Sequence, residues 1–268
     1  NDMYLPVYAA GNDHEGIYLG SFPLTQLNPT KGGLDQLTNE NTAKNPVVVA
    51  AVEGITDYVS TGYVDDFVVN NVVLSDFSQW GPTDDFRIKP DISAKGVDVF
   101  SSIATGVNNY TDYDGTSMAA PSVTAVFALW QQYRNQLWPL KGHMKAASLK
   151  ALMAHTASEA GSYKENSTSI NYIASPEGPD PRFGWGLINA KGGAEVMKAA
   201  KANQAVFEEL TLSNNQTYSR TVTASGLEPL VATIAWTDGA ASVVSETDSS
   251  NSLLINDLDL RVRRVSNN

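Results

Sequence analysis

The chain contains no cysteine, and this absence excludes disulfide bonds and thiol chemistry. It also contains no apolar run approaching about 18 residues, the length that a membrane-spanning helix requires. No signal peptide is visible, and we expect the N-terminus that would carry one to lie outside this sequence. The 268 residues, 42% of them apolar, can bury a substantial core, and we expect one large domain and one smaller domain.

Positive charge is scarce. Eighteen Lys and Arg stand against 29 Asp and Glu, which gives a formal net charge of −11. The acidic residues are spread along the chain, and no basic stripe offsets their repulsion of a phosphate backbone. We therefore expect no nucleic-acid partner, and ordinary solubility explains the charge.

One serine near the middle of the chain lies between a glycine and an apolar helical run. Residues 115–121 read Gly-Thr-Ser-Met-Ala-Ala-Pro, and the helical run begins at Val123. A serine in the first turn of a helix has its hydroxyl and N–H at the positive end of the helix dipole, where negative charge developing on a substrate oxygen is stabilised. The motif predicts that Ser117 is a nucleophile. The alternative is that Ser117 only caps the helix.

The serine motif resembles that of the subtilisin-like proteases, and the match continues through Thr124 and Ala125. Residues 5–12, Leu-Pro-Val-Tyr-Ala-Ala-Gly-Asn, read as a short buried strand that ends in Gly-Asn. The resemblance implies that Asn12 is the side-chain donor of the oxyanion hole. Without the resemblance, Gly-Asn after a strand indicates only a turn.

Two further stretches are similar to the same family. Residues 77–82 and 88–96 look like the sequence that leads into the serine loop, with one departure: Ala94-Lys95-Gly96 stands where the family usually has Ala-Pro-Gly. Residues 183–186, Phe-Gly-Trp-Gly, resemble a later family segment, and we interpret them as structural, with the glycines letting backbone pack beside the indole.

The base and the acid of a serine-protease triad are not evident. In this family they precede the oxyanion asparagine, in His-Gly-Thr and Asp-Ser/Thr-Gly motifs, and neither motif occurs here. The three histidines, His14, His143 and His155, are most simply surface or packing residues. We therefore expect the chain to be a C-terminal portion of a longer protease, carrying nucleophile and oxyanion hole but lacking the catalytic Asp and His, and to be nearly inactive alone.

Short apolar strands alternate with helices over the first 200 residues, which predicts an α/β fold with a largely parallel sheet flanked by helices. Residues 45–52 and 97–103 read as buried strands. Residues 123–138, 146–157 and 190–202 have helical spacing. A Gly-, Asn- and Thr-rich connection over 13–42 is expected either beside a specificity pocket or as a surface insertion.

The pattern changes after about residue 204. Segments 207–212, 218–224, 230–236 and 258–262 show β-type alternation between turn-rich stretches. We expect residues 1–203 to be the C-terminal portion of a subtilisin-like catalytic domain and 204–268 to be a partial, jelly-roll-like β-sandwich.

No cofactor is expected for catalysis, but structural calcium is possible. Asp257 and Asp259 offer the oxygen ligands that calcium prefers, although alternating Asp on a strand also describes a solvent face.

Two functional classes remain. The first is a subtilisin-type serine endopeptidase, secreted or at the cell surface, acting on protein or peptide substrates together with the missing N-terminal part of the same protein. The second is a non-catalytic scaffold or binding protein that keeps the fold. The presence of both the nucleophile and the oxyanion donor favours the enzyme.

Overall fold

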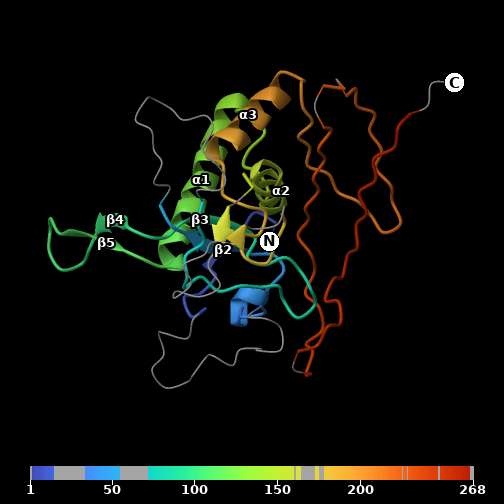
Figure 1. Ribbon diagram of the computed structural model, residues 1–268. Helices are drawn as coiled ribbons and strands as arrows, with labels where there is room; N and C mark the ends of the chain where they lie inside the picture. The colour runs from blue at the N-terminus through green and yellow to red at the C-terminus, as the bar shows by residue number, and fades with distance from the viewer. Residues whose placement is uncertain are drawn as a thin grey trace.

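Three parallel strands form the centre of the molecule (Figure 1). The computed structural model describes residues 2–14, 34–54, 72–159, 161–163, 173–174, 178–224, 226–227, 229–246 and 248–265. The strands β1 (Val7–Ala9), β2 (Val47–Val52) and β3 (Ile92–Lys95) lie in the order β1-β2-β3. Their registers place Ala9 beside Val49 and Val52 beside Lys95, so all three strands end at the same edge of the sheet.

The middle strand β2 is buried along its whole length. Its sequence, Val-Val-Val-Ala-Ala-Val, has no polar face, as expected for a strand covered on both sides. Successive side chains point to opposite faces, so Val47, Val49 and Ala51 join one core cluster, whereas Ala50 and Val52 join another. The predicted buried strand over 45–52 is confirmed.

Three helices cover the first face: α1 (Thr116–Leu137), α2 (Ala146–Thr156) and α3 (Ala190–Lys201). Trp130 of α1 lies at their centre, 1% exposed, and its indole N–H donates to the carbonyl of Ala190 at 2.8 Å. Gly193 of α3 makes room for this ring, since a Cβ there would lie 2.3 Å from it. The α/β prediction with a parallel sheet and helices is confirmed.

Irregular segments cover the opposite face within the described ranges. Val72, Leu74, Trp80 and Phe183 pack there against β2. The described residues also include a short 3-10 helix, η3 (Asn39–Thr42), and a two-stranded pair, β6 (Ser162–Tyr163) with β7 (Ile173–Ala174). Most of the predicted connection over 13–42 lies outside the described residues.

A hairpin of two strands, β4 (Val99–Ser102) and β5 (Tyr110–Tyr113), projects from the body of the molecule (Figure 1). We call residues 98–114 the arm. The strand predicted over 97–103 is therefore present. Its predicted burial is wrong, because among the described strands β4 pairs with β5 alone and Phe100 is 68% exposed.

Helix α1 begins seven residues before the apolar run that starts at Val123. Pro121 lies inside it. A proline keeps a helical φ but has no N–H, so the carbonyl four residues earlier, that of Ser117, loses its usual donor. Small neighbours, Ala119 and Ala120, pack this turn against the sheet.

The segment 183–186 is structural, as predicted, but its glycines act differently. Gly184 and Gly186 have φ of 67° and 116°. A Cβ on Gly184 would lie 2.4 Å from the backbone of Asp91, and one on Gly186 would lie 2.2 Å from the carbonyl oxygen of Ser158. The two glycines therefore make room for neighbouring backbone. They do not make room for the indole of Trp185, which is 40% exposed.

The described part of residues 204–265 has no assigned strand, so the predicted partial β-sandwich is not confirmed. Its segments are extended and lie beside the rest of the molecule (Figure 1, orange and red). The boundary between residues 203 and 204 stays a prediction. In the described residues, no helix has both the length and the apolar character needed to cross a membrane.

Candidate active site

The candidate site lies where the carboxyl ends of β1 and β3 meet the N-terminus of α1. Gly11 and Asn12 follow β1, Gly96 follows β3, and Gly115 precedes α1. The amide of Gly115 donates to the carbonyl of Gly96 at 2.7 Å, and the amide of Gly96 donates to Val52 at 2.9 Å. These bonds attach the serine loop to the edge of the sheet where α/β proteins place their ligands.

Two glycines permit this close approach. Gly115 has φ 149° and ψ 156°, a backbone region that is essentially restricted to glycine. A Cβ on Gly96 would lie 2.6 Å from the Cβ of Ala51 and 2.7 Å from the carbonyl oxygen of Gly115. The departure at Lys95 therefore leaves the turn intact, because the glycine that follows it makes the contact.

Asn12 is held by the residue before the serine. Its Oδ1 accepts from the amide of Thr116 at 2.9 Å and from the Thr116 hydroxyl at 2.7 Å. The same hydroxyl accepts from the amide of Gly11 at 3.1 Å. Because Oδ1 is committed to Thr116, the amide orientation is fixed, and Nδ2 lies toward Gly115, 3.3 Å from where a Cβ on that glycine would be.

Ser117 is the second residue of α1 and is exposed. Its N–H is one of the four at a helix N-terminus that have no intrahelical acceptor, and it lies at the positive end of the dipole. The next two amides, of Met118 and Ala119, donate to the carbonyl of Gly115 at 2.9 and 3.4 Å. The structure thus brings the two predicted site residues, Ser117 and Asn12, to one place, joined through Thr116.

Sequence reasoning missed Thr116 as the residue that joins them. Its position inside the serine motif was visible, but the motif does not say which side chain faces back toward β1. Thr116 is fully buried, so its hydroxyl needs partners within the protein, and it finds both in the Gly11-Asn12 pair.

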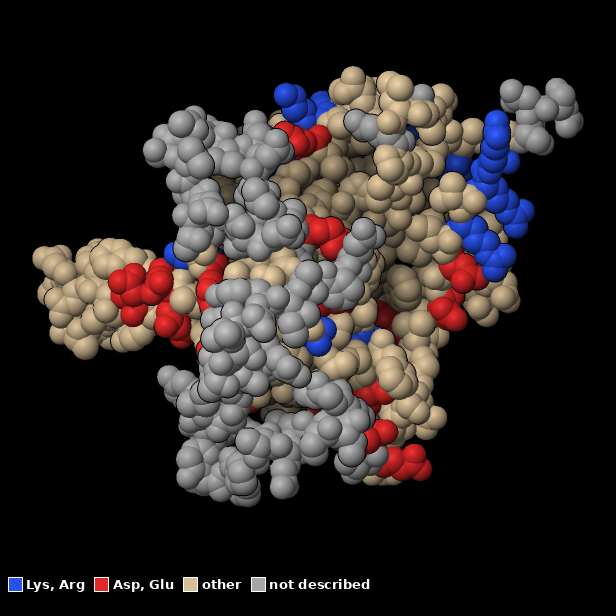
Figure 2. Space-filling model, viewed as in Figure 1, with Lys and Arg blue, Asp and Glu red and all other residues tan. Residues whose placement is uncertain are grey.

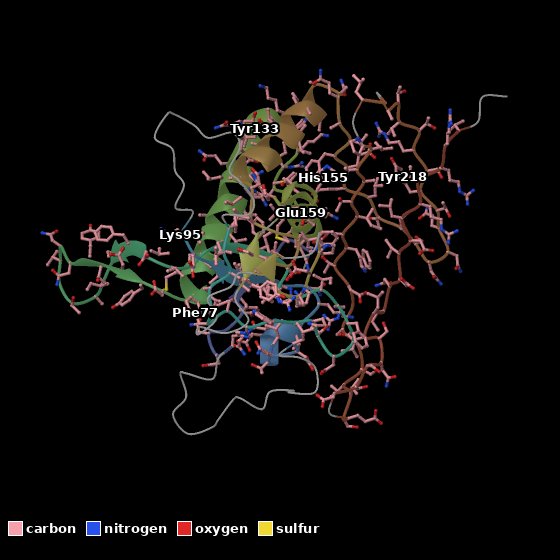
Figure 3. The ribbon with its side chains drawn as sticks, in the orientation of Figure 1. Phe77, Lys95, Tyr133, His155, Glu159 and Tyr218 are labelled. Atoms are coloured by element: carbon pink, nitrogen blue, oxygen red, sulfur yellow. The ribbon has the colours of Figure 1, made fainter. Side chains whose placement is uncertain are left out.

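The described contacts of two histidines are structural. His14 stacks on Trp80 with ring centroids 3.9 Å apart, and its Nδ1 lies 2.8 Å from Oε1 of Gln36. Nδ1 of His155, on α2, lies 3.0 Å from the hydroxyl oxygen of Thr233. Figure 3 shows His155 turned toward the C-terminal segment, well apart from Lys95 and Phe77 near the site. His143 is exposed in the turn before α2.

A buried ion pair lies at the opposite, amino end of the sheet. Lys89, 2% exposed, donates to Asp91 at 2.5 Å and to the carbonyl of Pro46 at 2.7 Å. Burial lowers the pKa of Lys89 to about 8 even though Asp91 acts against it. Burial would raise the pKa of Asp91, but Lys150, Lys89 and the amide of Val48 hold it below its ordinary value. The pair fixes the start of β3 against β2 and takes no part in the candidate site.

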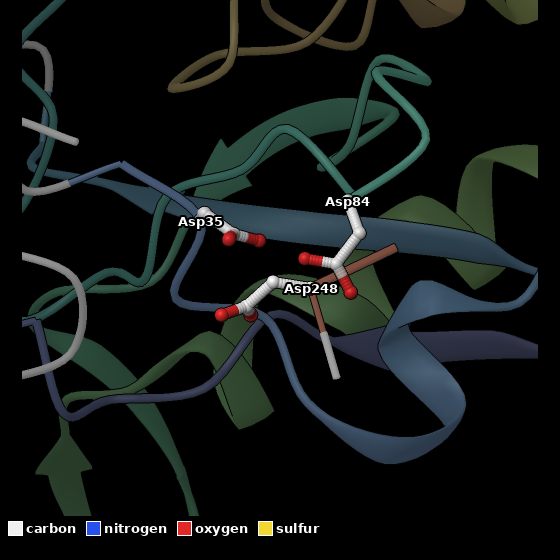
Figure 4. A group of neighbouring side chains, drawn as sticks. All are labelled: Asp35, Asp84 and Asp248. Atoms are coloured by element: carbon white, nitrogen blue, oxygen red, sulfur yellow. The ribbon is translucent and has the colours of Figure 1, made fainter. Parts of the chain in front are cut away.

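One group of carboxylates could hold a cation. Asp35, Asp84 and Asp248 each offer an oxygen within 4.8 Å of the others, from three distant parts of the chain (Figure 4). The predicted ligands Asp257 and Asp259 are not in this group, and Asp259 pairs with Arg261 at 3.1 Å. Structural calcium stays a prediction.

Comparisons with known proteins identify the family of this chain. The model of the subtilase family matches residues 1–186. The chain is 52% identical over 64 residues to the C5a peptidase of Streptococcus pyogenes, a match that covers 24% of this chain and 5% of the relative. It is 29% identical over 197 residues to the PI-type proteinase of Lactococcus lactis subsp. cremoris, covering 68% of this chain and 10% of that protein.

A third relative is the bacillopeptidase F of Bacillus subtilis, 36% identical over 120 residues, or 45% of this chain and 7% of the relative. The matched parts of this chain thus span only 5 to 10% of the length of these three relatives. The family model, in contrast, covers more than two thirds of the chain and includes the sheet, the serine loop and α1. The chain therefore belongs to the subtilase family of serine peptidases.

Proposed function

We propose that the protein is a serine endopeptidase in which Ser117 attacks the carbonyl carbon of a peptide bond. The hydroxyl loses its proton to a base as the Oγ–C bond forms, and the carbonyl oxygen becomes an oxyanion. The same proton then passes to the leaving amine as the C–N bond breaks, which gives an acyl-enzyme that water hydrolyses.

The oxyanion is stabilised by two donors, the N–H of Ser117 and Nδ2 of Asn12. The observation that carries this proposal is the anchoring of Asn12 Oδ1 by both the amide and the hydroxyl of Thr116. A donor whose orientation is fixed before the reaction needs no reorganisation in the transition state, where such stabilisation counts most. Removing a donor of this kind from subtilisin costs about 10² to 10³ in kcat, and we adopt that figure for Asn12→Ala.

We assign the general base and its orienting carboxylate to polypeptide other than these 268 residues, because the His-Gly-Thr and Asp-Ser/Thr-Gly motifs are absent from the sequence. The contacts of His14 with Trp80 and of His155 with Thr233 support this assignment. It follows that the 268-residue chain alone should have little peptidase activity. Protein or peptide substrates, and a location outside the cell or at its surface, follow from the proposed activity.

The proposal is tested by labelling Ser117 with a fluorophosphonate. We expect the protein at the full length of its gene to be labelled and the 268-residue chain to react far more slowly. Ser117→Ala is the blank, and Ser122→Ala, an exposed serine of the same helix, is the matched control that should label normally. If the full-length protein with any propeptide removed does not react at Ser117, the enzyme proposal is wrong and the non-catalytic scaffold replaces it.

A further inference from the structure

The arm exposes aromatic side chains that a folded protein usually buries. Phe100 is 68% exposed and Tyr110 is 58% exposed. Their rings stack on each other with centroids 5.6 Å apart and an angle of 21° between their planes. The pair therefore places two neighbouring aromatic side chains in solvent, and exposed apolar surface of this kind is typical of a contact site for another molecule.

The strand register adds a carboxylate to the same face. Phe100 lies directly opposite Asp112, and Tyr110 lies directly opposite Ser102. Directly opposed side chains of an antiparallel pair share a face, with Cβ atoms about 5 Å apart. The face that carries the two aromatic rings therefore also carries the exposed carboxylate of Asp112.

The charge of the arm has one sign. Asp98, Asp112 and Asp114 are all exposed, and the sequence between Gly96 and Tyr133 contains no Lys or Arg. Figure 2 shows carboxylates on the arm, at the left of the view, among uncharged side chains. The cation beside the base of the arm, Lys95, donates to the carbonyl of Asp98 at 3.0 Å and lies outside the arm itself. The surface is complementary to a positively charged partner.

The arm is also held in place and joined directly to the serine loop. At its base, the amide of Asp98 donates to the carboxylate of Asp114 at 2.7 Å. At its tip, the amide of Ile103 donates to the carbonyl of Asn109 at 3.0 Å. Asp114 is followed at once by Gly115 and then by Ser117. A preformed surface loses little entropy when it binds, and the arm ends at Asp114, three residues before the proposed nucleophile.

We propose that the aromatic and acidic face of the arm, formed by Phe100, Tyr110 and Asp112, binds an arginine-bearing segment of the polypeptide substrate outside the bond that is cut. The assignment rests on the proposed function for the identity of the partner. A guanidinium is planar and weakly hydrated, so it stacks on aromatic rings while it pairs with a carboxylate. The arm would thus select substrates in addition to whatever the cleft itself selects.

The test is a binding measurement that requires no chemistry. In the Ser117→Ala protein, fluorescence anisotropy measures the affinity for a fluorescein-labelled peptide of three Gly-Arg-Ser repeats and for its Gly-Glu-Ser counterpart. We expect binding of the arginine peptide only. The double substitution Phe100→Ala and Tyr110→Ala should weaken it about tenfold, and Asp112→Asn should weaken it about threefold, as expected for cation–π and partly exposed charge contacts.

The matched controls are Tyr4→Ala, which removes an aromatic residue 68% exposed elsewhere, and Glu246→Gln, which removes one exposed charge outside the arm. Both should leave the affinity unchanged. If the controls weaken binding as much as the arm variants do, or if the glutamate peptide binds equally well, the proposal is wrong. Failure of Ser117 to label would overturn the proposed function and would leave this binding result unaffected, so the two failures can be told apart.

Discussion

At the scale of single residues, the site depends on how one amide group is oriented. Asn12 could present either its side-chain oxygen or its nitrogen to a substrate. The amide and the hydroxyl of Thr116 both donate to the oxygen, which leaves the nitrogen for the substrate. Thr116 would touch no substrate in this arrangement. It acts through Asn12, and we therefore regard it as a positioning residue for the proposed oxyanion hole.

Replacing Thr116 by Val tests this role because valine keeps the shape and removes the hydroxyl. We expect the rate of fluorophosphonate labelling in the full-length protein to fall about tenfold, as the amide of Asn12 loses one of its two constraints. The free energy of unfolding should fall by about 1 to 3 kcal/mol, because the partly buried amide of Gly11 loses its acceptor. Thr116→Ser keeps the hydroxyl and should restore most of the rate. An equal loss in both variants would contradict the positioning role.

The serine motif placed Ser117 at a helix start and the family resemblance singled out Asn12 after a strand, and the structure brings the two residues together, while their catalytic roles stay a prediction. The link through Thr116 and the grouping of Asp35, Asp84 and Asp248 could not be predicted in this way. They depend on contacts between residues 49 to 213 positions apart, which tertiary packing alone determines.

At the scale of elements, the serine loop depends on contact between two turns. Gly96, after β3, approaches the carbonyl of Gly115, before α1, so closely that it has no room for a side chain, and Gly115 has a backbone conformation that is essentially restricted to glycine. Backbone contact between these two turns therefore positions Ser117 relative to the sheet, together with the hydrogen bonds between Asn12 and Thr116.

We predict that Gly96→Ala lowers the free energy of unfolding by about 1 to 3 kcal/mol and slows Ser117 labelling, because its Cβ would press against Ala51 and the carbonyl of Gly115. Urea unfolding and the labelling rate are the measurements. Gly54→Ala, whose Cβ would meet only the Cε of Lys95 at 3.6 Å, is the matched control and should change neither. An unchanged labelling rate in folded Gly96→Ala would show that the contact does not position the serine.

The helices 146–157 and 190–202 were predicted to within one residue of α2 and α3, because their residues follow helical spacing over the whole of each element. The helical spacing at 123–138 covers only the later part of α1, because the serine motif and Pro121 interrupt that spacing in its first two turns, although Ser117 was expected in the first turn of a helix. The burial of residues 97–103 was wrong because alternation cannot tell a core strand from a projecting hairpin.

At the scale of the whole molecule, one carboxylate joins the C-terminal segment to the sheet. Asp238, 6% exposed, accepts from the amides of Ile255 and Asn256, both at 2.9 Å, and from Lys44 at 2.6 Å. Its own amide donates to the side chain of Asn45, just before β2, at 2.9 Å. Burial raises the pKa of Asp238, but these hydrogen bonds and the ammonium outweigh it, so the pKa lies well below 3.8.

The sign of the pH dependence follows. A carboxyl whose pKa is lower in the folded state contributes stability above pH 3.8, its unfolded value, and loses that contribution as the pH falls toward the folded value. We predict that Asp238→Asn is less stable than the unchanged protein at pH 5 and that the difference shrinks as the pH is lowered to about 2.5. The midpoints of urea unfolding at several pH values measure this difference in stability. Asp257→Asn should follow the unchanged protein throughout, and a constant difference for Asp238→Asn would contradict the linkage.

The contact between Asn45 and Asp238 also bears on the order of folding. It joins residues 193 positions apart, so forming it early would close a very long loop at a large entropic cost. Contacts of such sequence separation are slow to form, whereas α1, α2 and α3 are local. The sheet and its helices should therefore assemble first, and the C-terminal segment should dock last, on a surface around Lys44 and Asn45 that is complete by then.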